Sequence, residues 1–386
     1  MKKKIVYIID DINYVSGAQK VSIFQIQKMQ EYYDIYVLSL TKPRISLQFL
    51  KKDHILDPHI WGKTEMYAVS LKKVMKSKEY SLKQKASRLF YALCLRIGKG
   101  EWYFEQLIDE CLRPLLEKFD DVIVISEASK MRHFVSTLEN PKKIQWIHTD
   151  YGSWSEFSEW SRAVVRNDAD IYIKYDRIVV LSEHCRSGVV KKIPAITNKV
   201  VVIPNLIDGD AILKLSREKN FGEIPNDCLK LITVARLDKE KGLDELLQKA
   251  LKLKKQINFK WYVIGDGPDR TGLERLREKL NLKNEVEFLG YMENPYPIMK
   301  QCDALVLLSK YEGTPVTIDE AMVLGIGIVA PAIGGIPEQV RGYSNCILLD
   351  VSEMEKVFLN WNFLEKVQFD YRSSNLEKIK KLWEII

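Results

Sequence analysis

Residues 311–331, YEGTPVTIDEAMVLGIGIVAP, place a helix directly before a buried strand. Thr314 followed by Pro315 predicts the helix start, as an N-cap residue and a proline at the first helical position. The apolar residues after Pro315 suit a buried helix, and the IGIVAP run suits a buried strand. Because a helix start presents free backbone amides, Glu312 and Glu320 on either side of it mark a candidate binding site.

The same pattern, short β-branched runs separated by helical stretches, extends along the rest of the chain. Continuous apolar strands that alternate with helices predict parallel sheets covered on both faces. The chain has 386 residues, which is long for a single core, so we predict an α/β protein with two doubly wound, Rossmann-like domains. We expect the first domain over residues 1–205 and the second over 206–360. The expected strands are 5–9, 35–40, 121–126, 144–148, 177–182 and 200–204, then 231–235, 260–265, 285–290, 303–309, 326–331 and 346–350.

Composition excludes several classes of protein. The sequence is 46% hydrophobic and 29% charged, as in a soluble globular protein. It has no run of about 18 uncharged apolar residues that could cross a bilayer. The six cysteines show no C-x-x-C spacing and the five histidines no H-E-x-x-H pattern, so we expect no disulfide framework, no metal site and no cofactor. We interpret the start, MKKKIVYIIDD, as a first strand and not as a signal peptide, which favours a cytoplasmic protein.

Positive charge is concentrated in residues 61–100, which hold ten Lys or Arg and two Glu, whereas the whole chain has a net charge of +7. This segment also contains an apolar run, LFYALCL (89–95). It is either a solvated helix face beside a buried one, or a basic amphipathic element over residues 63–99 that rests on an anionic membrane surface or meets an anionic acceptor. No recognised nucleic-acid motif accompanies the charge, so nucleic acid is not an expected partner.

Polar residues follow the expected strands at the points where open α/β sheets bind their ligands. Because two such domains facing each other enclose a cleft, we expect these residues to line it. In the first half they are Ser16, Gly17, His148, Asp150 and Asn205, and in the second half they are Arg236, Gly265, Gly267 and Glu312.

Arg236 and Lys241 place two cations beside a predicted helix start, where they form either a pair of surface charges or a site for a diphosphate. The amides of Val316 and Thr317 would add an anion site without a metal. Glu320, one turn further along the helix, would repel phosphate but could accept hydrogen bonds from a ribose diol. A nucleoside diphosphate satisfies all of these groups together.

Two other motifs carry less weight. GDGP (265–268) has Arg270 where a dinucleotide fingerprint needs its third glycine, which argues against an NAD site. DAD (168–170) and DGD (208–210) have the form of metal–nucleotide sites, but such short acidic patterns are common by chance.

Residues 311–338, with two glutamates eight positions apart, resemble the signature of the family-4 glycosyltransferases of the GT-B fold. The blocks VIPNLID, ARLDKEKG, VIGDGP, FLGY and CDALVLLS are similar to other blocks of that family and occur in the same order. The resemblance runs from the first strand to about Glu338 and is strongest in the second half. In the first half, YVSGAQK resembles the family's glycine-rich loop, with a serine where a second glycine is usual.

The resemblance implies a retaining transfer of a sugar from a nucleotide-activated donor, most often a UDP-sugar, without a divalent metal. Arg236 and Lys241 would hold the diphosphate, Glu312 would face the hydroxyls of the donor sugar, and His148 would touch that sugar from the first domain. No protein base is indicated, because the leaving phosphate can itself take the acceptor's proton. A C-terminal helix, about 361–386, would pack back on the first domain. Further donor contacts would come from Gly17, Asn205, Gly265, Gly267, Gly313, Thr314, Pro315, Val316, Thr317 and Glu320.

The acceptor is expected at the first domain, near Ser16, Asp150 and Trp154. The stretch WIHTDYGSWSEFSEWSR (146–162) brings three tryptophans there, which are either buried or platforms for sugar rings. Together with the basic segment, this suggests a cytoplasmic enzyme at the inner face of the plasma membrane. It would glycosylate a glycan or polyprenyl-linked acceptor in bacterial capsular or cell-wall polysaccharide synthesis. A sugar-nucleotide epimerase of the same architecture and a non-catalytic partner subunit are the alternatives, and the oligomeric state is not indicated.

Overall fold

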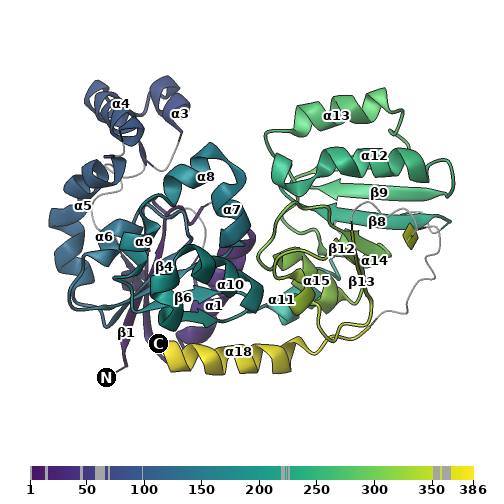
Figure 1. Ribbon diagram of the computed structural model, residues 1–386. Coiled ribbons are helices and arrows are strands. Elements are labelled where there is room, and N and C mark those ends of the chain that lie inside the picture. Colours follow the sequence, from purple (N-terminus) through teal and green to yellow (C-terminus); the bar gives the residue numbers. More distant parts are fainter. Residues whose placement is uncertain are drawn as a thin grey trace. The chain divides into compact units, whose positions relative to one another are not determined.

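A computed structural model describes most of the chain, which divides into two compact units (Figure 1). The N-terminal unit comprises Met1–Val180, Arg186–Ile203 and Glu384–Ile386, and the C-terminal unit comprises Leu181–Cys185 and Pro204–Trp383. Each unit is built on one sheet of parallel strands. The described residues are 2–13, 16–43, 47–56, 66–67, 70–97, 99–218, 222, 224, 227–350, 357–358 and 367–386.

The sheet of the N-terminal unit has the strand order β3-β2-β1-β4-β5-β6-β7. All six strands expected from the sequence are confirmed. The additional strand, β3, is only two residues long, which is too short to produce a recognisable pattern. The strands are β1 (Lys4–Ile9), β2 (Asp34–Ser39), β3 (Ile55–Leu56), β4 (Asp121–Ile125), β5 (Lys142–Trp146), β6 (Arg177–Val180) and β7 (Val200–Val202).

The helices of the N-terminal unit connect these strands, and α3 and α4 fall in the basic segment between β3 and β4. Parts of that segment, residues 61–65, 68–69 and 98, lie outside the described residues. The helices are α1 (Gly17–Met29), α3 (Leu71–Lys76), α4 (Leu82–Arg96), α5 (Gly100–Leu116), α6 (Arg132–Ser136), α7 (Tyr151–Phe157), α8 (Glu159–Val164), α9 (Asp168–Tyr172) and α10 (Glu183–Lys192), whose first residues belong to the C-terminal unit.

The sheet of the C-terminal unit has the order β10-β9-β8-β11-β12-β13, and its six strands confirm those expected. Its strands are β8 (Leu229–Val234), β9 (Phe259–Ile264), β10 (Val286–Gly290), β11 (Ala304–Val306), β12 (Gly327–Pro331) and β13 (Cys346–Leu349). Its helices are α11 (Gly209–Leu215), α12 (Leu243–Leu253), α13 (Arg270–Lys279), α14 (Tyr296–Gln301), α15 (Val316–Leu324), α16 (Ile336–Gln339) and α18 (Tyr371–Ile385).

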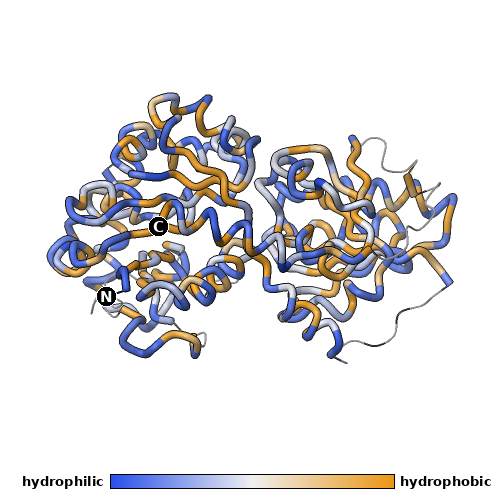
Figure 2. The backbone as a smooth tube through the Cα atoms, turned by 90° about the horizontal axis from the view of Figure 1, so that it is seen from below, coloured by the Kyte–Doolittle hydropathy of each residue, from blue (hydrophilic) through white to orange (hydrophobic). Residues whose placement is uncertain are grey.

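Both faces of the C-terminal sheet are buried, which explains why its strands are apolar at successive positions. Ile232 and Ile264 pack with α11, α14 and α15 in one core cluster, whereas Leu231 and Val263 pack with α12 and α13 in another. Figure 1 shows these two groups of helices on opposite faces of the sheet. In the hydropathy view, apolar stretches run through the interior of each unit and hydrophilic stretches mark many outer turns (Figure 2).

Each sheet has one point where the strand order reverses direction. In the C-terminal unit this switch point lies between β8 and β11, and in the N-terminal unit it lies between β1 and β4. The loops that follow the two strands at a switch point diverge to opposite faces of the sheet, which leaves room for a ligand between them. The loops after β8 and β11 carry Arg236 and Glu312.

The helix expected over residues 361–386 is present as α18, and residues 361–366 lie outside the described part of the chain. We expected this helix to pack back on the first domain. Its body contacts the C-terminal unit, since Tyr371 Oη donates to Asp210 Oδ1 at 2.8 Å and Asn375 Nδ2 donates to the carbonyl of Ile207 at 2.6 Å. Its last three residues belong to the N-terminal unit, where Lys3 Nζ donates to the carbonyl of Ile386 at 2.7 Å.

Candidate functional site

The start of α15 differs from the sequence-based expectation by one residue. Pro315 is the N-cap, with φ −65° and ψ 124°, and the helix begins at Val316. Thr314 was expected to be the cap, but its carbonyl and its hydroxyl both accept hydrogen bonds from Asn205 Nδ2 at 3.1 Å. The amides of Val316 and Thr317 therefore lie in the first turn of a nine-residue helix, where the helix dipole favours an anion.

Lys241 and Glu312 form a close ion pair at the switch point, with 2.6 Å between Nζ and Oε1. Their side chains are only 21% and 11% exposed. Burial alone lowers the pKa of Lys241, but the neighbouring Glu312 carboxylate more than offsets this effect, so the pKa is raised. Lys241 is thus a partly buried permanent cation, and the sequence alone did not predict that Glu312 would hold it.

Arg236 lies on the same loop as Lys241 and is more exposed, with 50% of its side chain accessible. Its guanidinium bonds to the carboxylate of Asp238 and lies 3.5 Å from Glu240 Oε2. These two carboxylates orient the guanidinium from within its own loop. Because guanidinium has five donors, this orientation is compatible with further bonds to a phosphate group.

Gly265 and Gly267 were expected to contact the donor, and the structure gives both a packing role beside Arg236. A Cβ on Gly265 would lie 1.9 Å from the carbonyl oxygen of Ala235, and one on Gly267 would lie 2.3 Å from that of Leu237. Gly265 also has φ +138°, in the region that favours glycine. The two glycines allow the loop after β9 to press directly against the loop that carries Arg236.

Asn205 lies beneath the loop after β11 and supports it from inside the unit. Only 4% of the residue is exposed, and its side chain bonds to Thr314 as described above. Its carbonyl accepts a hydrogen bond from Lys378 Nζ of α18 at 2.6 Å. The loop is held on its other side by Gly335, whose amide donates to the carbonyl of Gly313 at 2.8 Å. Asn205 is thus placed to shape the Gly313–Pro315 loop.

Glu320 follows one turn after the start of α15 and is 2% exposed. Its Oε1 accepts a hydrogen bond from the hydroxyl of Tyr296 at 2.8 Å. Tyr296 comes from α14 and was not singled out in the sequence, because nothing in its neighbourhood reveals a partner 24 residues away. Burial, followed by the charge of Glu320, raises the pKa of the Tyr296 hydroxyl, which therefore stays protonated and donates.

Ser16 and Gly17 lie at the start of α1 in the N-terminal unit. Ser16 is the N-cap, and its side chain accepts from the amide of Gln19 at 3.3 Å while Gln19 Oε1 accepts from the amide of Ser16 at 3.0 Å. This capping box gives Ser16 a structural role that the spacing Ser-x-x-Gln could have revealed. Gly17 is the first helical residue.

His148 follows β5, at the carboxyl edge of the N-terminal sheet. Burial lowers the pKa of its ring to about 4, so the imidazole is neutral near pH 7. Its Nε2 is buried and has no hydrogen-bond partner among the described residues. The ring lies beside Trp146, with 6.4 Å between centroids and 21° between planes.

The burial of His148 predicts a pH-dependent term in the stability of the protein. The folded pKa of about 4 is below the ordinary value of 6.5, so this stabilisation is present above pH 6.5 and is lost as the pH falls toward 4. Between pH 7 and pH 4.5 we expect wild type to lose about 2 kcal/mol more free energy of unfolding than His148→Asn. Urea unfolding of both proteins at the two pH values measures this difference, and equal losses would show that His148 is not buried in its neutral form.

Asp150 and Trp154, both expected near the acceptor, are buried. Asp150 is the N-cap of α7, and its Oδ2 accepts from the hydroxyl of Ser153 at 2.6 Å. Trp154 is 7% exposed and packs edge-on against Trp160, with 5.9 Å between ring centroids. Trp160 is 61% exposed and is the tryptophan of this stretch that can offer a face to a sugar ring.

The structure places no cluster of three His, Cys, Asp or Glu side chains suited to a metal ion within the described ranges. Nor does any helix of those ranges have the length and apolar character needed to cross a bilayer. Arg236 and Lys241 are two positive charges on the segment that follows β8.

Residues 216–367 match the family model described as glycosyl transferases group 1. A protein of Methanocaldococcus jannaschii named as an uncharacterized glycosyltransferase is 28% identical over 218 residues, which cover 55% of this chain and 53% of that protein. The O-antigen biosynthesis glycosyltransferase WclY of Escherichia coli is 28% identical over 165 residues, which cover 42% of this chain and 45% of WclY. The chain thus spans about half the length of these curated relatives.

The crystal structure of HepE from Anabaena, in complex with UDP and glucose, is similar over 99% of this chain and 100% of HepE. The TM-score is 0.69 at 16% sequence identity, so this similarity concerns the fold. Both parallel sheets are included in it. Residues 216–367 are thus similar to the group 1 glycosyltransferases, and the two parallel sheets have the GT-B fold.

Proposed function

We propose that this protein transfers a sugar from a nucleoside-diphosphate donor to a hydroxyl group of an acceptor. One observation carries the proposal. The ion pair of Lys241 and Glu312, 2.6 Å long, lies at the switch point of the C-terminal sheet, directly before the first turn of α15. A partly buried cation and a helix start at the same sheet edge suit the diphosphate of a donor.

In the proposed reaction the bond between the anomeric carbon and the diphosphate oxygen breaks, and its electron pair leaves with the nucleoside diphosphate. The oxygen of the acceptor hydroxyl forms the new bond to the anomeric carbon. Lys241 and Arg236 stabilise the negative charge that grows on the diphosphate, so that no divalent metal is needed. The proton of the acceptor passes to the leaving phosphate, and the sugar keeps its anomeric configuration.

The remaining groups of the C-terminal unit bind the donor without taking part in bond breaking. Glu312 orients Lys241 with one oxygen and presents its carboxylate to the hydroxyls of the donor sugar. Gly313 and the amides of Val316 and Thr317 contact the sugar and the phosphates. Glu320, whose carboxylate is fixed by Tyr296, accepts hydrogen bonds from the ribose. We propose UDP as the nucleotide, in line with the UDP in the HepE crystal structure.

The acceptor is proposed to be a glycan or polyprenyl-linked sugar of a bacterial surface polysaccharide, bound by the N-terminal unit. The name of the relative WclY, an O-antigen biosynthesis glycosyltransferase, supports this class. His148 would touch the donor sugar, and the exposed face of Trp160 would stack on a sugar ring of the acceptor.

Incubation with labelled nucleotide sugars and a bacterial lipid extract, in the presence of EDTA, tests the function. Release of nucleotide coupled to a labelled glycolipid is the expected result. A changed sugar on an intact nucleotide would instead identify an epimerase, and no reaction with any donor would identify a non-catalytic subunit. Complete loss of transfer in EDTA that magnesium restores would overturn the role given to Arg236 and Lys241.

Helix α4 carries an apolar stripe on its exposed side, which we propose to rest on an anionic membrane. The stripe consists of Leu82, Leu89, Phe90, Leu93 and Ile97, and 43–87% of each residue is exposed. The opposite side of the helix, with Tyr91 and Cys94, is buried. The stripe is therefore not a core face, and the neighbouring helix α3 adds three exposed lysines, Lys72, Lys73 and Lys76.

Charge reversal of Lys72, Lys73 and Lys76 tests the membrane proposal. Each lysine near an anionic surface contributes about 1 kcal/mol, so the triple Glu variant should bind phosphatidylglycerol vesicles at least about 100-fold more weakly. The matched control reverses Lys255, Lys279 and Lys283, which are exposed on the C-terminal unit. Unchanged co-sedimentation of the first variant, or equal loss by the second, would contradict membrane binding through α3 and α4.

A further inference from the structure

The loop after β4 lies at the switch point of the N-terminal sheet, where the order of strands reverses between β1 and β4. Its first residue, Ser126, has φ +99°. Among the described residues other than glycine, only Asn281 shares a positive φ. For a residue other than glycine, such a backbone conformation is unfavourable and persists only where its surroundings enforce it. The positive φ of Ser126 therefore indicates that neighbouring residues hold the loop in one specific conformation.

Neighbouring strands enforce this conformation by hydrogen bonds to the loop. Gln145 of β5 donates from Nε2 to the carbonyl of Ser126 at 2.8 Å, and the amide of Ser126 donates to the carbonyl of Trp146 at 3.2 Å. Asp10, directly after β1, accepts from the Ser129 hydroxyl at 2.5 Å and from the amide of Lys130 at 2.9 Å. The loop is thereby tied to the strands on both sides of β4.

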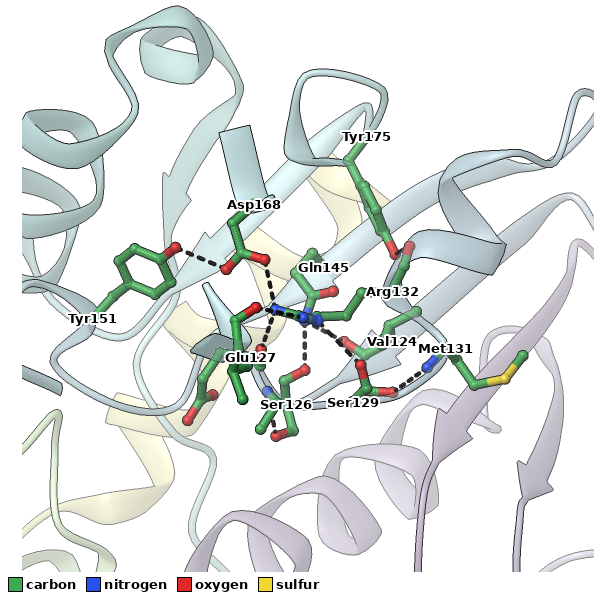
Figure 3. A network of polar contacts seen from close by, with 12 residues as sticks. Val124, Ser126, Glu127, Ser129, Met131, Arg132, Gln145, Tyr151, Asp168 and Tyr175 are labelled. Atoms are coloured by element: carbon green, nitrogen blue, oxygen red, sulfur yellow. Dashed lines mark hydrogen bonds and ion pairs between the residues drawn. The ribbon is translucent and has the colours of Figure 1, made fainter. Parts of the chain in front are cut away.

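Arg132 holds the loop from inside the unit, and its side chain is almost completely buried. It donates to the carbonyls of Glu127 at 2.7 Å and Ser129 at 3.0 Å (Figure 3). Its charge is balanced by Asp168, which lies 2.6 Å away and is fully buried. Asp168 in turn accepts from the hydroxyl of Tyr151 at 2.7 Å. Such a completely paired network holds the backbone of Glu127 at one place.

The side chain of Glu127 reaches the loop after β5. Its Oε2 accepts a hydrogen bond from the backbone amide of His148 at 3.1 Å. Burial raises the pKa of this carboxyl, and the amide of His148 is among the groups that oppose the effect. The bond fixes the backbone from which the His148 ring extends, and that ring has a buried Nε2 without a protein partner in the described chain.

We propose that Glu127 is a positioning residue, which holds His148 so that its Nε2 meets a hydroxyl group of the substrate. The proposal rests on the sugar-transfer function given above. A neutral imidazole nitrogen is a suitable partner for a hydroxyl, and a hydrogen bond to it is productive only when the ring is correctly placed. Glu127 is in turn held in place by its surroundings, which are the strained Ser126, the contacts of Asp10 and the Arg132–Asp168 pair.

Two substitutions at Glu127 separate positioning from proton transfer. Glu127→Gln keeps a side-chain oxygen at the position that accepts from His148, whereas Glu127→Ala removes it. We expect kcat for sugar transfer to fall about 100-fold in Glu127→Ala and to stay within about threefold of wild type in Glu127→Gln. The affinity for UDP, measured by calorimetry, should be unchanged in both because the C-terminal unit binds the nucleotide.

A double variant tests whether Glu127 acts through His148. His148→Ala should lower kcat by a similar factor, and Glu127→Ala in the same chain should add no further loss. The matched control is Glu117→Ala. The Glu117 carboxylate accepts from the amides of Glu139 at 3.0 Å and Asn140 at 2.8 Å, away from the switch point. The Glu117→Ala variant should keep the kcat of wild type.

Three outcomes would overturn the proposal while leaving the proposed function intact. Wild-type kcat in Glu127→Ala would show that the bond to His148 is not needed. An equal loss in Glu127→Gln, with an unchanged melting temperature, would show that the charge is needed for proton transfer. If kcat of the double variant falls by the product of the two single-variant factors, Glu127 and His148 act separately. If wild type itself transfers no sugar from any donor, it is the proposed function that fails.

Discussion

Replacing Lys241 with alanine is expected to lower kcat/KM for sugar transfer by at least about 100-fold. The side chain is a partly buried cation whose charge is secured by Glu312 at 2.6 Å. In the proposed reaction it faces negative charge that grows as the diphosphate leaves, and such a preorganised charge is worth more in the transition state than in the ground state. The loss should therefore appear mainly in kcat, in steady-state kinetics with saturating donor.

The control for Lys241→Ala is Lys239→Ala, two residues away on the same loop and exposed. It removes the same charge without removing the contact to Glu312, and it should change kcat/KM by less than about twofold. Arg236→Ala should reduce the rate in the same direction as Lys241→Ala, because both cations are assigned to the diphosphate. If Lys241→Ala keeps the rate of wild type, the donor site does not lie at the switch point of the C-terminal sheet.

Replacing Arg132 with methionine is expected to lower the free energy of unfolding of the N-terminal unit by about 3–5 kcal/mol. The substitution leaves Asp168, which is fully buried, without its cation and removes donors from the carbonyls of Glu127 and Ser129. Denaturant-dependent hydrogen exchange of the amides in β4 and β5 measures this unit separately. Asp168→Asn should cost less, because an amide oxygen still accepts from Arg132 and Tyr151.

An exposed ion pair provides the comparison for Arg132. Lys283 and Glu278 are 2.9 Å apart, but their side chains are 62% and 54% exposed. Lys283→Met should therefore change the free energy of unfolding by less than about 1 kcal/mol. A cost for Arg132→Met as small as this would show that the buried network does not hold the loop after β4.

The strands were predictable because both faces of each sheet are covered, which leaves continuous apolar runs in the sequence. Thus all twelve expected strands occur, and the missed β3 has only two residues. The positions of Arg236, Lys241 and Glu312 after strands were also predictable, since the loops at the carboxyl ends of parallel strands share one sheet edge. Their pairing was not, because Lys241 and Glu312 are separated by 71 positions.

The structure shows local roles of several expected site residues that their positions after strands do not indicate. Ser16 and Asp150 follow strands, but each caps the helix that comes next. Gly265 and Gly267 were expected to contact the donor, and they also make room for the backbone beside Arg236. Trp154 is buried, and its neighbour Trp160 is exposed. Position relative to a strand indicates where a residue lies along the sheet edge, whereas capping and packing decide where its side chain points.

The residues that escaped prediction are those whose partners are far away in the chain. Glu127 bonds to the backbone of His148, Arg132 pairs with Asp168, and Tyr296 bonds to Glu320. None of these pairs has a spacing that a single sequence reveals. The positive φ of Ser126 is equally invisible, because serine is common in loops and rarely adopts that conformation.

Calorimetric titration with UDP in EDTA, with UMP as the comparison, tests the central claim most directly. The claim is that the C-terminal unit binds a nucleoside diphosphate through Lys241, Arg236 and the start of α15. We expect UDP to bind wild type without a metal, at least about 100-fold more tightly than UMP, and Lys241→Ala to lose most of this difference. Equal affinity for UDP and UMP, or binding of UDP that is unchanged in Lys241→Ala, would contradict it.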